Sequence, residues 1–179
     1  NVGFCSEGSC RAIPFSGATS STTPQCGADG CMISGATQAL YCNRDLCLTP
    51  AVVGATGSGS TVRCGGDGCI IPGSNVAVYC SRGACQSVAL NGASATATTS
   101  SCGNDGCMVP GANTVAYCSR GSCRTDSDNG VSSSSPIVCG RRGCMAPGND
   151  QSLYCFQGSC RILSVVGVTG SSVAAAFID

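Results

Sequence analysis

The sequence predicts an all-β protein made of tandem antiparallel hairpins that repeat about every 38 residues and are each closed by a disulfide. Three observations support this fold class. All 18 cysteines of the 179 residues fall into pairs with the spacing C-x4-C. Val, Ile, Tyr and Thr form short runs separated by Gly, Pro, Asn and Asp, as in strands and turns. No segment shows a sustained helical period.

The cysteine pairs are expected to form local disulfides. An even number of cysteines with one repeated spacing is typical of a disulfide framework formed in an oxidising compartment. Zinc is disfavoured because the chain has no His and structural zinc sites often combine closer Cys pairs with His. A four-residue turn places its flanking cysteines opposite each other, at a separation that a disulfide can span. The expected bridges are Cys5–Cys10, Cys26–Cys31, Cys42–Cys47, Cys64–Cys69, Cys80–Cys85, Cys102–Cys107, Cys118–Cys123, Cys139–Cys144 and Cys155–Cys160.

Two kinds of cysteine pair alternate along the chain. The A motifs are CGADGC at 26–31, CGGDGC at 64–69, CGNDGC at 102–107 and CGRRGC at 139–144. The B motifs are CSEGSC at 5–10, CNRDLC at 42–47, CSRGAC at 80–85, CSRGSC at 118–123 and CFQGSC at 155–160. The A motifs start 38, 38 and 37 residues apart, and ten residues always separate an A motif from the following B motif. A fixed period of this length is the signature of a repeat architecture.

The repeats divide one domain, 1–179, into similar units. We expect a half-repeat at 1–21, repeats at 22–59, 60–97, 98–134 and 135–162, and a C-terminal strand or hairpin segment at 163–179. In the second repeat the expected strands are 60–64, 69–72, 75–80 and 85–90, joined by turns at 65–68, 73–74 and 81–84. The Gly-x-Asp-Gly turns of the A motifs suit a positive φ, which Gly and Asp tolerate.

The array is expected to be either open or closed into a five-bladed, propeller-like ring. The C-terminal segment has two apolar runs around a Gly/Ser turn, and an uncovered apolar hairpin is an aggregation liability. Its natural partner is the first B hairpin, which has no A motif before it. Pairing within one chain would close the ring, whereas pairing with a second copy would give a head-to-tail homopolymer. The residues expected to mediate this pairing are Val165, Val166, Val168, Val173, Phe177 and Ile178.

An aromatic residue recurs directly before each B motif. The members of this aromatic ladder are Phe4, Tyr41, Tyr79, Tyr117 and Tyr154. Equivalent positions imply equivalent environments, and interior packing is the simpler expectation. The alternative is an exposed ladder that stacks on sugar rings.

Composition and charge exclude several classes of function. Only 10% of the residues are charged, nine Arg balance nine acidic residues, and Lys and His are absent. Nucleic-acid binding is not expected without clustered cations, and a Ser–His or Cys–His pair is impossible. No apolar run reaches the roughly 20 residues of a membrane span. We therefore expect no enzymatic activity, no cofactor, no metal, no nucleic-acid partner and no membrane insertion.

Several recurring polar residues are better explained by turns than by chemistry. Asp29, Asp67 and Asp105 recur in the A motifs, but one Asp per hairpin is not a calcium site. Arg44, Arg82 and Arg120 recur in the B motifs, where they can pair with an Asp of a neighbouring turn. The Ser/Thr-rich connectors between B and A motifs are compatible with O-glycosylation, and the stretch 96–101 raises ice binding as a minor alternative.

The segment VAVYC-SRGA-CQSVAL, two strands joined by a Cys-flanked turn, resembles the Cys-paired hairpins of extracellular β-repeat and β-propeller-like proteins. The resemblance covers nearly the whole chain as a pattern and implies an architecture, but no functional residue.

Together these patterns predict a secreted, non-enzymatic structural protein. Its most concrete form is the subunit of an extracellular filament, appendage or surface coat that assembles with copies of itself through its chain ends. The alternative is a carbohydrate-binding, lectin-like propeller with glycans as partners. The start at Asn1, without Met or signal peptide, is expected for a processed secreted product or for a fragment of a longer chain.

Overall fold

The computed structural model describes residues 1–6, 9–17, 23–52, 61–93, 99–132 and 135–164. Across these ranges every regular element is a β-strand, and none contains a helix that could cross a membrane. The strands form one two-stranded hairpin and four four-stranded antiparallel sheets. The all-β expectation is therefore confirmed.

The hairpin and the sheets follow one another along the chain. The hairpin consists of β1 (Val2–Ser6) and β2 (Ser9–Ile13). The first sheet contains β3 (Gln25–Cys26), β4 (Cys31–Ser34), β5 (Ala39–Asn43) and β6 (Leu46–Leu48). The second contains β7 (Arg63–Cys64), β8 (Cys69–Pro72), β9 (Val76–Ser81) and β10 (Ala84–Ala89). The third contains β11 (Ser101–Cys102), β12 (Cys107–Pro110), β13 (Thr114–Ser119) and β14 (Ser122–Ser127). The fourth contains β15 (Val138–Gly140), β16 (Gly143–Pro147), β17 (Gln151–Phe156) and β18 (Ser159–Ser164).

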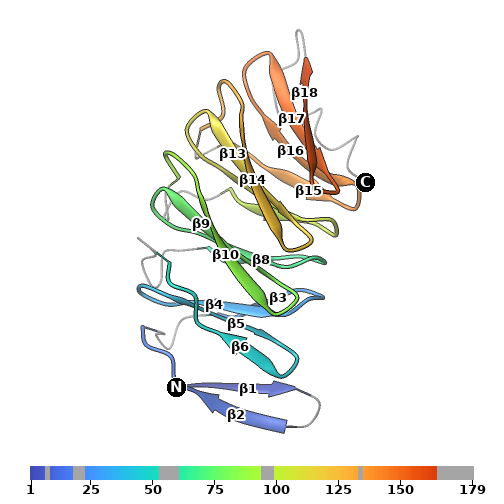
Figure 1. Ribbon diagram of the computed structural model, residues 1–179. Coiled ribbons are helices and arrows are strands. Elements are labelled where there is room, and N and C mark those ends of the chain that lie inside the picture. The colour runs from blue at the N-terminus through green and yellow to red at the C-terminus, as the bar shows by residue number, and fades with distance from the viewer. Residues whose placement is uncertain (7–8, 18–22, 53–60, 94–98, 133–134, 165–179) are drawn as a thin grey trace.

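The sheets stack face to face in an open column (Figure 1), with the β1–β2 hairpin at one end and the fourth sheet at the other. Strands within each sheet lie in chain order. Of the two arrangements that the sequence leaves open, the described residues form the open array, and they close no ring.

All nine expected disulfides are present, each between the two cysteines of one motif. The two motifs of a sheet are also in register, so that in the second sheet Cys69 lies opposite Cys80. The four cysteines of a sheet therefore form one row across its strands. The bridges indicate that the chain folds in an oxidising environment.

The central strands of the second and third sheets are buried on both faces because these sheets have neighbours on both sides. All residues of β8 and β12 are buried, whereas β10 and β14 at the sheet edge are only partly buried. Strands covered on both faces have continuous apolar runs rather than strict alternation. This explains runs such as CIIP and VAVY.

Each interface between sheets follows one packing rule. The Met or Ile after an A motif lies opposite the Tyr before the B motif, as in the pair Ile70 and Tyr79. These two side chains share a buried core with Cys107 and Cys118 of the next sheet. The same arrangement joins Met32 and Tyr41 to the second sheet and Met108 and Tyr117 to the fourth. The disulfides thus also provide the packing face of each sheet.

The turns differ from expectation in two respects. The B turn is shorter than expected, because Ser81 and Ala84 already pair and leave only Arg82 and Gly83 in the turn. The prediction of a positive φ in the A turns is wrong for the first three motifs. Among the described turn residues the positive angles lie instead in the B turns and other loops, and Gly143 is the A-motif exception.

Candidate functional site

The cysteine-flanked turns of all sheets lie along one edge of the column, which we call the turn edge. It consists of the A turns 27–30, 65–68 and 103–106 and the B turns 44–45, 82–83, 120–121 and 157–158, with Gly140 and Gly143 flanking the last A turn. Both kinds of turn reach this edge because the cysteines that flank them are aligned across each sheet. The recurring Asp, Tyr and Arg residues of the sequence meet here.

The A-turn aspartates join each sheet to the next. The Tyr79 hydroxyl donates to Oδ2 of Asp67 at 2.6 Å, within one sheet. The same oxygen accepts the backbone N–H of Arg120, in the B turn of the next sheet, at 2.5 Å. We call this arrangement the Asp clamp. Because it crosses an interface between sheets, it stabilises stacking rather than the turn alone.

The Asp clamp occurs at all three interfaces between four-stranded sheets. Asp29 accepts from the Tyr41 hydroxyl at 2.5 Å and from the Arg82 N–H at 2.7 Å. Asp105 accepts from the Tyr117 hydroxyl at 2.5 Å and from the Gln157 N–H at 2.7 Å. The expected Asp–Arg proximity between neighbouring turns is therefore real, but the donor is the backbone N–H. For this reason Gln157 can replace Arg in the last clamp.

Burial and the clamp together hold the tyrosine hydroxyls in their neutral form. Burial, followed by the hydrogen bond to Asp29, raises the pKa of Tyr41 to about 12. The same two causes raise the pKa values of Tyr79 and Tyr117 still further. A neutral hydroxyl can donate to a carboxylate, whereas a phenolate next to that carboxylate would repel it.

The first glycine of the A motif allows the turns of successive sheets to touch. A Cβ on Gly65 would lie 2.3 Å from the carbonyl oxygen of Gly103, and a Cβ on Gly103 would lie 2.3 Å from that of Gly140. The backbone also bonds across the interface, since Gly66 N–H donates to the Gly103 carbonyl at 3.0 Å. Close approach of two backbones therefore requires this glycine. Sequence reasoning missed this role.

The fourth sheet departs from the pattern. Its A motif has Arg142 at the position of the clamp aspartate. The Tyr154 hydroxyl donates instead to the Arg142 carbonyl, and Arg161 lies over the Tyr154 ring at 5.3 Å. On this outer face Met145 packs with Tyr154 and Leu163. The last sheet thus has the Met and Tyr that pack against a following sheet in the internal interfaces, but it has no Asp clamp.

The aromatic ladder is mainly interior. Tyr41, Tyr79 and Tyr117 are at most 1% exposed, so interior packing is confirmed for them and they offer no ring for sugar stacking. Phe4 and Tyr154, in the two end units, are half-buried. The predicted assembly residues from Val165 to Ile178 lie outside the described residues.

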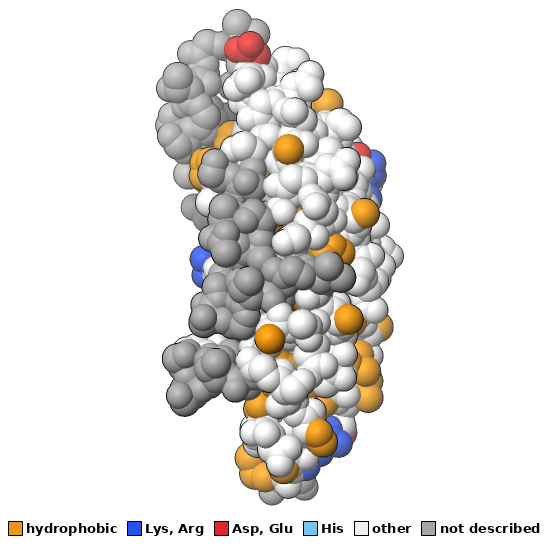
Figure 2. All heavy atoms as spheres, turned by 90° about the vertical axis from the view of Figure 1, so that its left-hand side faces the viewer, with side chains coloured by type: hydrophobic (Ala, Val, Ile, Leu, Met, Phe, Trp, Pro, Cys, Tyr) orange, Lys and Arg blue, Asp and Glu red, His pale blue; other side chains and the backbone are white. Residues whose placement is uncertain are grey.

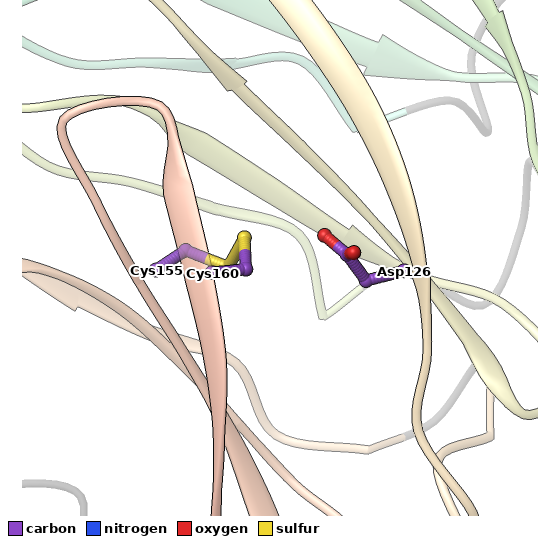
Figure 3. Close-up of side chains that lie close together, drawn as sticks. All are labelled: Asp126, Cys155 and Cys160. Carbon is purple, nitrogen blue, oxygen red and sulfur yellow. A yellow bond between two sulfur atoms is a disulfide. The ribbon is translucent and has the colours of Figure 1, made fainter.

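A grouping of Asp126, Cys155 and Cys160 resembles a metal-ligand cluster by distance. Figure 3 shows that the two sulfurs are bonded to each other, so neither is a free thiolate. Asp126 is paired with Arg124, whose Nε lies 2.7 Å from Oδ2. The chemistry of this donor set therefore does not suit a metal ion.

On the part of the face in Figure 2 that described residues form, hydrophobic side chains are scattered and charged ones are few. Two grooves are lined by described residues. One is at the turn edge between the first two sheets, with a volume of about 560 Å³. The other, of about 410 Å³, lies beside β7 and β11 and is lined by Arg63 and Ser100, among others.

Comparison with known proteins does not identify a family. No protein-family model and no curated protein matches the chain. Among solved structures it is similar to PorZ, described as an essential bacterial surface component of the type-IX secretion system of Porphyromonas gingivalis. The match has 10% identity and a TM-score of 0.39, and it covers 87% of this chain and 23% of that one. The chain spans about a quarter of PorZ, and a similarity this low supports no functional argument.

Proposed function

We propose that the protein is a secreted, non-enzymatic structural subunit that assembles head to tail into an extracellular filament, appendage or coat. The observation that carries this proposal is the complementarity of the two end faces of the column. Each internal interface packs a Met or Ile and a Tyr against the disulfides of the next sheet. The two ends carry the same two halves: Cys5 and Cys10 are exposed on the hairpin, and on the fourth sheet Met145 is buried beside the partly buried Tyr154 and Leu163.

At one end, the hairpin β1–β2 turns Phe4 toward the first sheet. Its disulfide Cys5–Cys10 is exposed, as is Ala12, whereas Cys80 and Cys118 are completely buried. At the other end, Met145, Tyr154 and Leu163 form the outer face of the fourth sheet. Stacking this face on the Cys5–Cys10 face of a second copy would continue the packing rule.

A contact between two different faces is heterologous, and repetition of such a contact gives an open filament when the rotation does not close. The column twists along its length (Figure 1), so that the strands of the β1–β2 hairpin and those of the fourth sheet run in different directions. The nine disulfides support the secreted location, since they form in oxidising compartments.

Assembly is tested by sedimentation and electron microscopy of the oxidised protein over a range of concentrations. Leu163→Arg places a charge on the outer face of the fourth sheet, and Ala12→Arg does so on the opposite end. Each variant alone should remain monomeric. Ile162→Arg is the matched control: Ile162 is the neighbour on β18, is 53% exposed and points to the other face.

An equimolar mixture of the two end variants gives the sharpest result. The intact fourth-sheet face of Ala12→Arg can still bind the intact hairpin face of Leu163→Arg, so the mixture should form dimers and nothing larger. The proposal would be overturned if the native protein stays monomeric at high concentration. It would also be overturned if the control Ile162→Arg is monomeric, like the two end variants.

A further inference from the structure

The turn edge carries a row of arginines that the stacking does not require. Arg44, Arg82 and Arg120 occupy the same position in the B turns of three successive sheets. These turns are in register along the column, because the Asp clamps fix Arg82 and Arg120 on their neighbours. All three side chains are exposed. We call them the arginine row.

The backbone at these positions disfavours arginine. The φ angles of Arg44, Arg82 and Arg120 are 48°, 53° and 54°, in the left-handed region. Two-residue hairpin turns of this kind favour Asn-Gly, since Asn tolerates a positive φ and a long side chain does so less well. The clamp uses only the backbone N–H, which any residue other than Pro supplies. A strained residue that the fold does not need indicates a role for its side chain.

The guanidinium groups of the row are available for a ligand. In the described part of the chain, none of the three lies within ion-pair distance of a carboxylate, and the one ion pair found there joins Arg124 to Asp126. The nearby Asp29 accepts hydrogen bonds from Tyr41, from the Arg82 N–H and, at 3.2 Å, from Nδ2 of Asn43. Its carboxylate remains a negative charge beside the row, but among the described residues it forms no ion pair with a guanidinium group of the row.

A groove runs between the first two members of the row. It has a volume of about 560 Å³ and is lined by Gly27, Ala28, Asp29, Gly30, Asn43, Arg44 and Arg82. The lining includes two glycines, past which a ligand can approach the backbone closely, and it carries two arginines and one aspartate.

We propose that the arginine row binds a linear acidic polysaccharide through carboxylate or sulfate groups. Arginine is suited to such groups because its planar fork donates two parallel hydrogen bonds. The row offers one cation per sheet. Nucleic acid has a far denser charge, which clustered cations neutralise better. A polysaccharide is also a polyanion expected outside the cell, which is the location that we propose for the protein.

The surroundings modulate the row. Asp45, exposed next to Arg44, lowers the positive potential at that end, so Arg82 and Arg120 should contribute most of the binding. The row lies on the side of the column and not on its end faces, so binding does not depend on assembly.

The test measures binding of polygalacturonate, which carries carboxylates, and of dextran sulfate by isothermal titration at low and physiological salt. Arg82→Asn and Arg120→Asn keep the N–H of the clamp and suit the turn better. Each should raise the melting temperature and lower affinity about tenfold, as expected for loss of a charge-assisted bond. Asp45→Asn should increase affinity. Binding should weaken with salt, and the preferred polymer identifies the anionic group.

Arg63→Gln is the matched control, since Arg63 is also an exposed arginine but lies on β7 and not in a B turn. The affinity of this variant should stay within about twofold of that of the native protein. The proposal is overturned if the row variants bind as well as the native protein, if Arg63→Gln weakens binding equally, or if neutral dextran binds as tightly. Tighter binding to a single-stranded oligonucleotide than to both polysaccharides would overturn it as well.

Discussion

The first three A turns and the fourth are nearly identical in sequence spacing but differ in one residue that changes their role. In the first three, an aspartate bonds the tyrosine of its own sheet and the B turn of the next. In the fourth, Arg142 takes that position and the hydroxyl of Tyr154 turns to a carbonyl. The comparison teaches that an A motif contains the clamp aspartate where another four-stranded sheet follows, and lacks it in the last sheet of the described column.

The largest effect should come from filling the glycine contact between internal sheets. Gly103→Ala would place a Cβ 2.3 Å from the carbonyl oxygen of Gly140, and backbone cannot move aside as a flexible side chain can. We expect a loss of about 3 kcal/mol in the free energy of unfolding, at the upper end for overpacking. Gly3→Ala is the control, because a Cβ on this β1 residue would meet no other atom within 4 Å. Denaturant unfolding under oxidising conditions compares the two, and equal stability of both variants would contradict the close-contact role.

The next effect tests the clamp itself. Asp67→Ala removes the carboxylate that accepts from two donors, the Tyr79 hydroxyl and the Arg120 N–H, and should cost about 2 kcal/mol because hydrogen bonds to a charged group are strong. Arg142→Ala, at the same place in the fourth sheet, should change stability by less than about 0.5 kcal/mol, as for an exposed surface residue. If both substitutions cost the same, the aspartate is only a turn residue.

Alkaline pH should weaken the internal interfaces through their tyrosines. Unfolded tyrosine ionises near pH 10, whereas the pKa of folded Tyr41 is about 12. The stabilisation by the neutral hydroxyl is therefore complete below about pH 10 and is lost as pH rises toward the folded pKa. Tyrosinate absorbance and thermal unfolding between pH 9 and pH 12 should show late ionisation coupled to loss of stability. Tyr79→Phe should reduce this coupling, and ionisation of all tyrosines near pH 10 without unfolding would contradict it.

The smallest effect distinguishes the third interface from the second. Asp128 and Leu90 occupy the same place in consecutive repeats and are almost completely buried. Burial raises the pKa of Asp128, although Gln151 and the Leu153 N–H donate to it and partly offset this. A raised folded pKa means stabilisation at acidic pH that is lost as pH rises through that pKa. Asp128→Asn should remove this part of the pH dependence in thermal melts between pH 3 and pH 7, and an unchanged profile would show that Asp128 does not contribute to it.

Much of the architecture follows from the cysteine spacing, since a constant C-x4-C motif specifies a local hairpin whatever lies between the motifs. The ten residues between Cys31 and Cys42 contain a turn at Gly35, which aligns the two motifs in one row. The interior position of Tyr79 follows in the same way from its recurrence. These features are local, so a single sequence can predict them.

The contacts between sheets could not be predicted in the same way. Asp67 reaches the N–H of a residue 53 positions later, and an aspartate in a turn is equally well explained by the turn. Gly65 likewise has a sufficient local explanation, although its actual constraint is the backbone of Gly103. One signal was present in the sequence: Arg142 replaces aspartate only in the last A motif, which a purely local role does not explain.

The row of four cysteines across each sheet also has a mechanical consequence. Tension along the column acts on the contacts between sheets, while the two cysteine-flanked hairpins of a sheet are covalently closed at their turns. When the chain is pulled from its ends, the sheets should therefore unfold one at a time. The residues enclosed by each disulfide cannot add to the length of the extended chain. Force spectroscopy of a tethered molecule would record short, regular steps that lengthen after reduction. A fibre built from such units would be stiff under small loads and would dissipate energy under large ones without breaking a backbone bond.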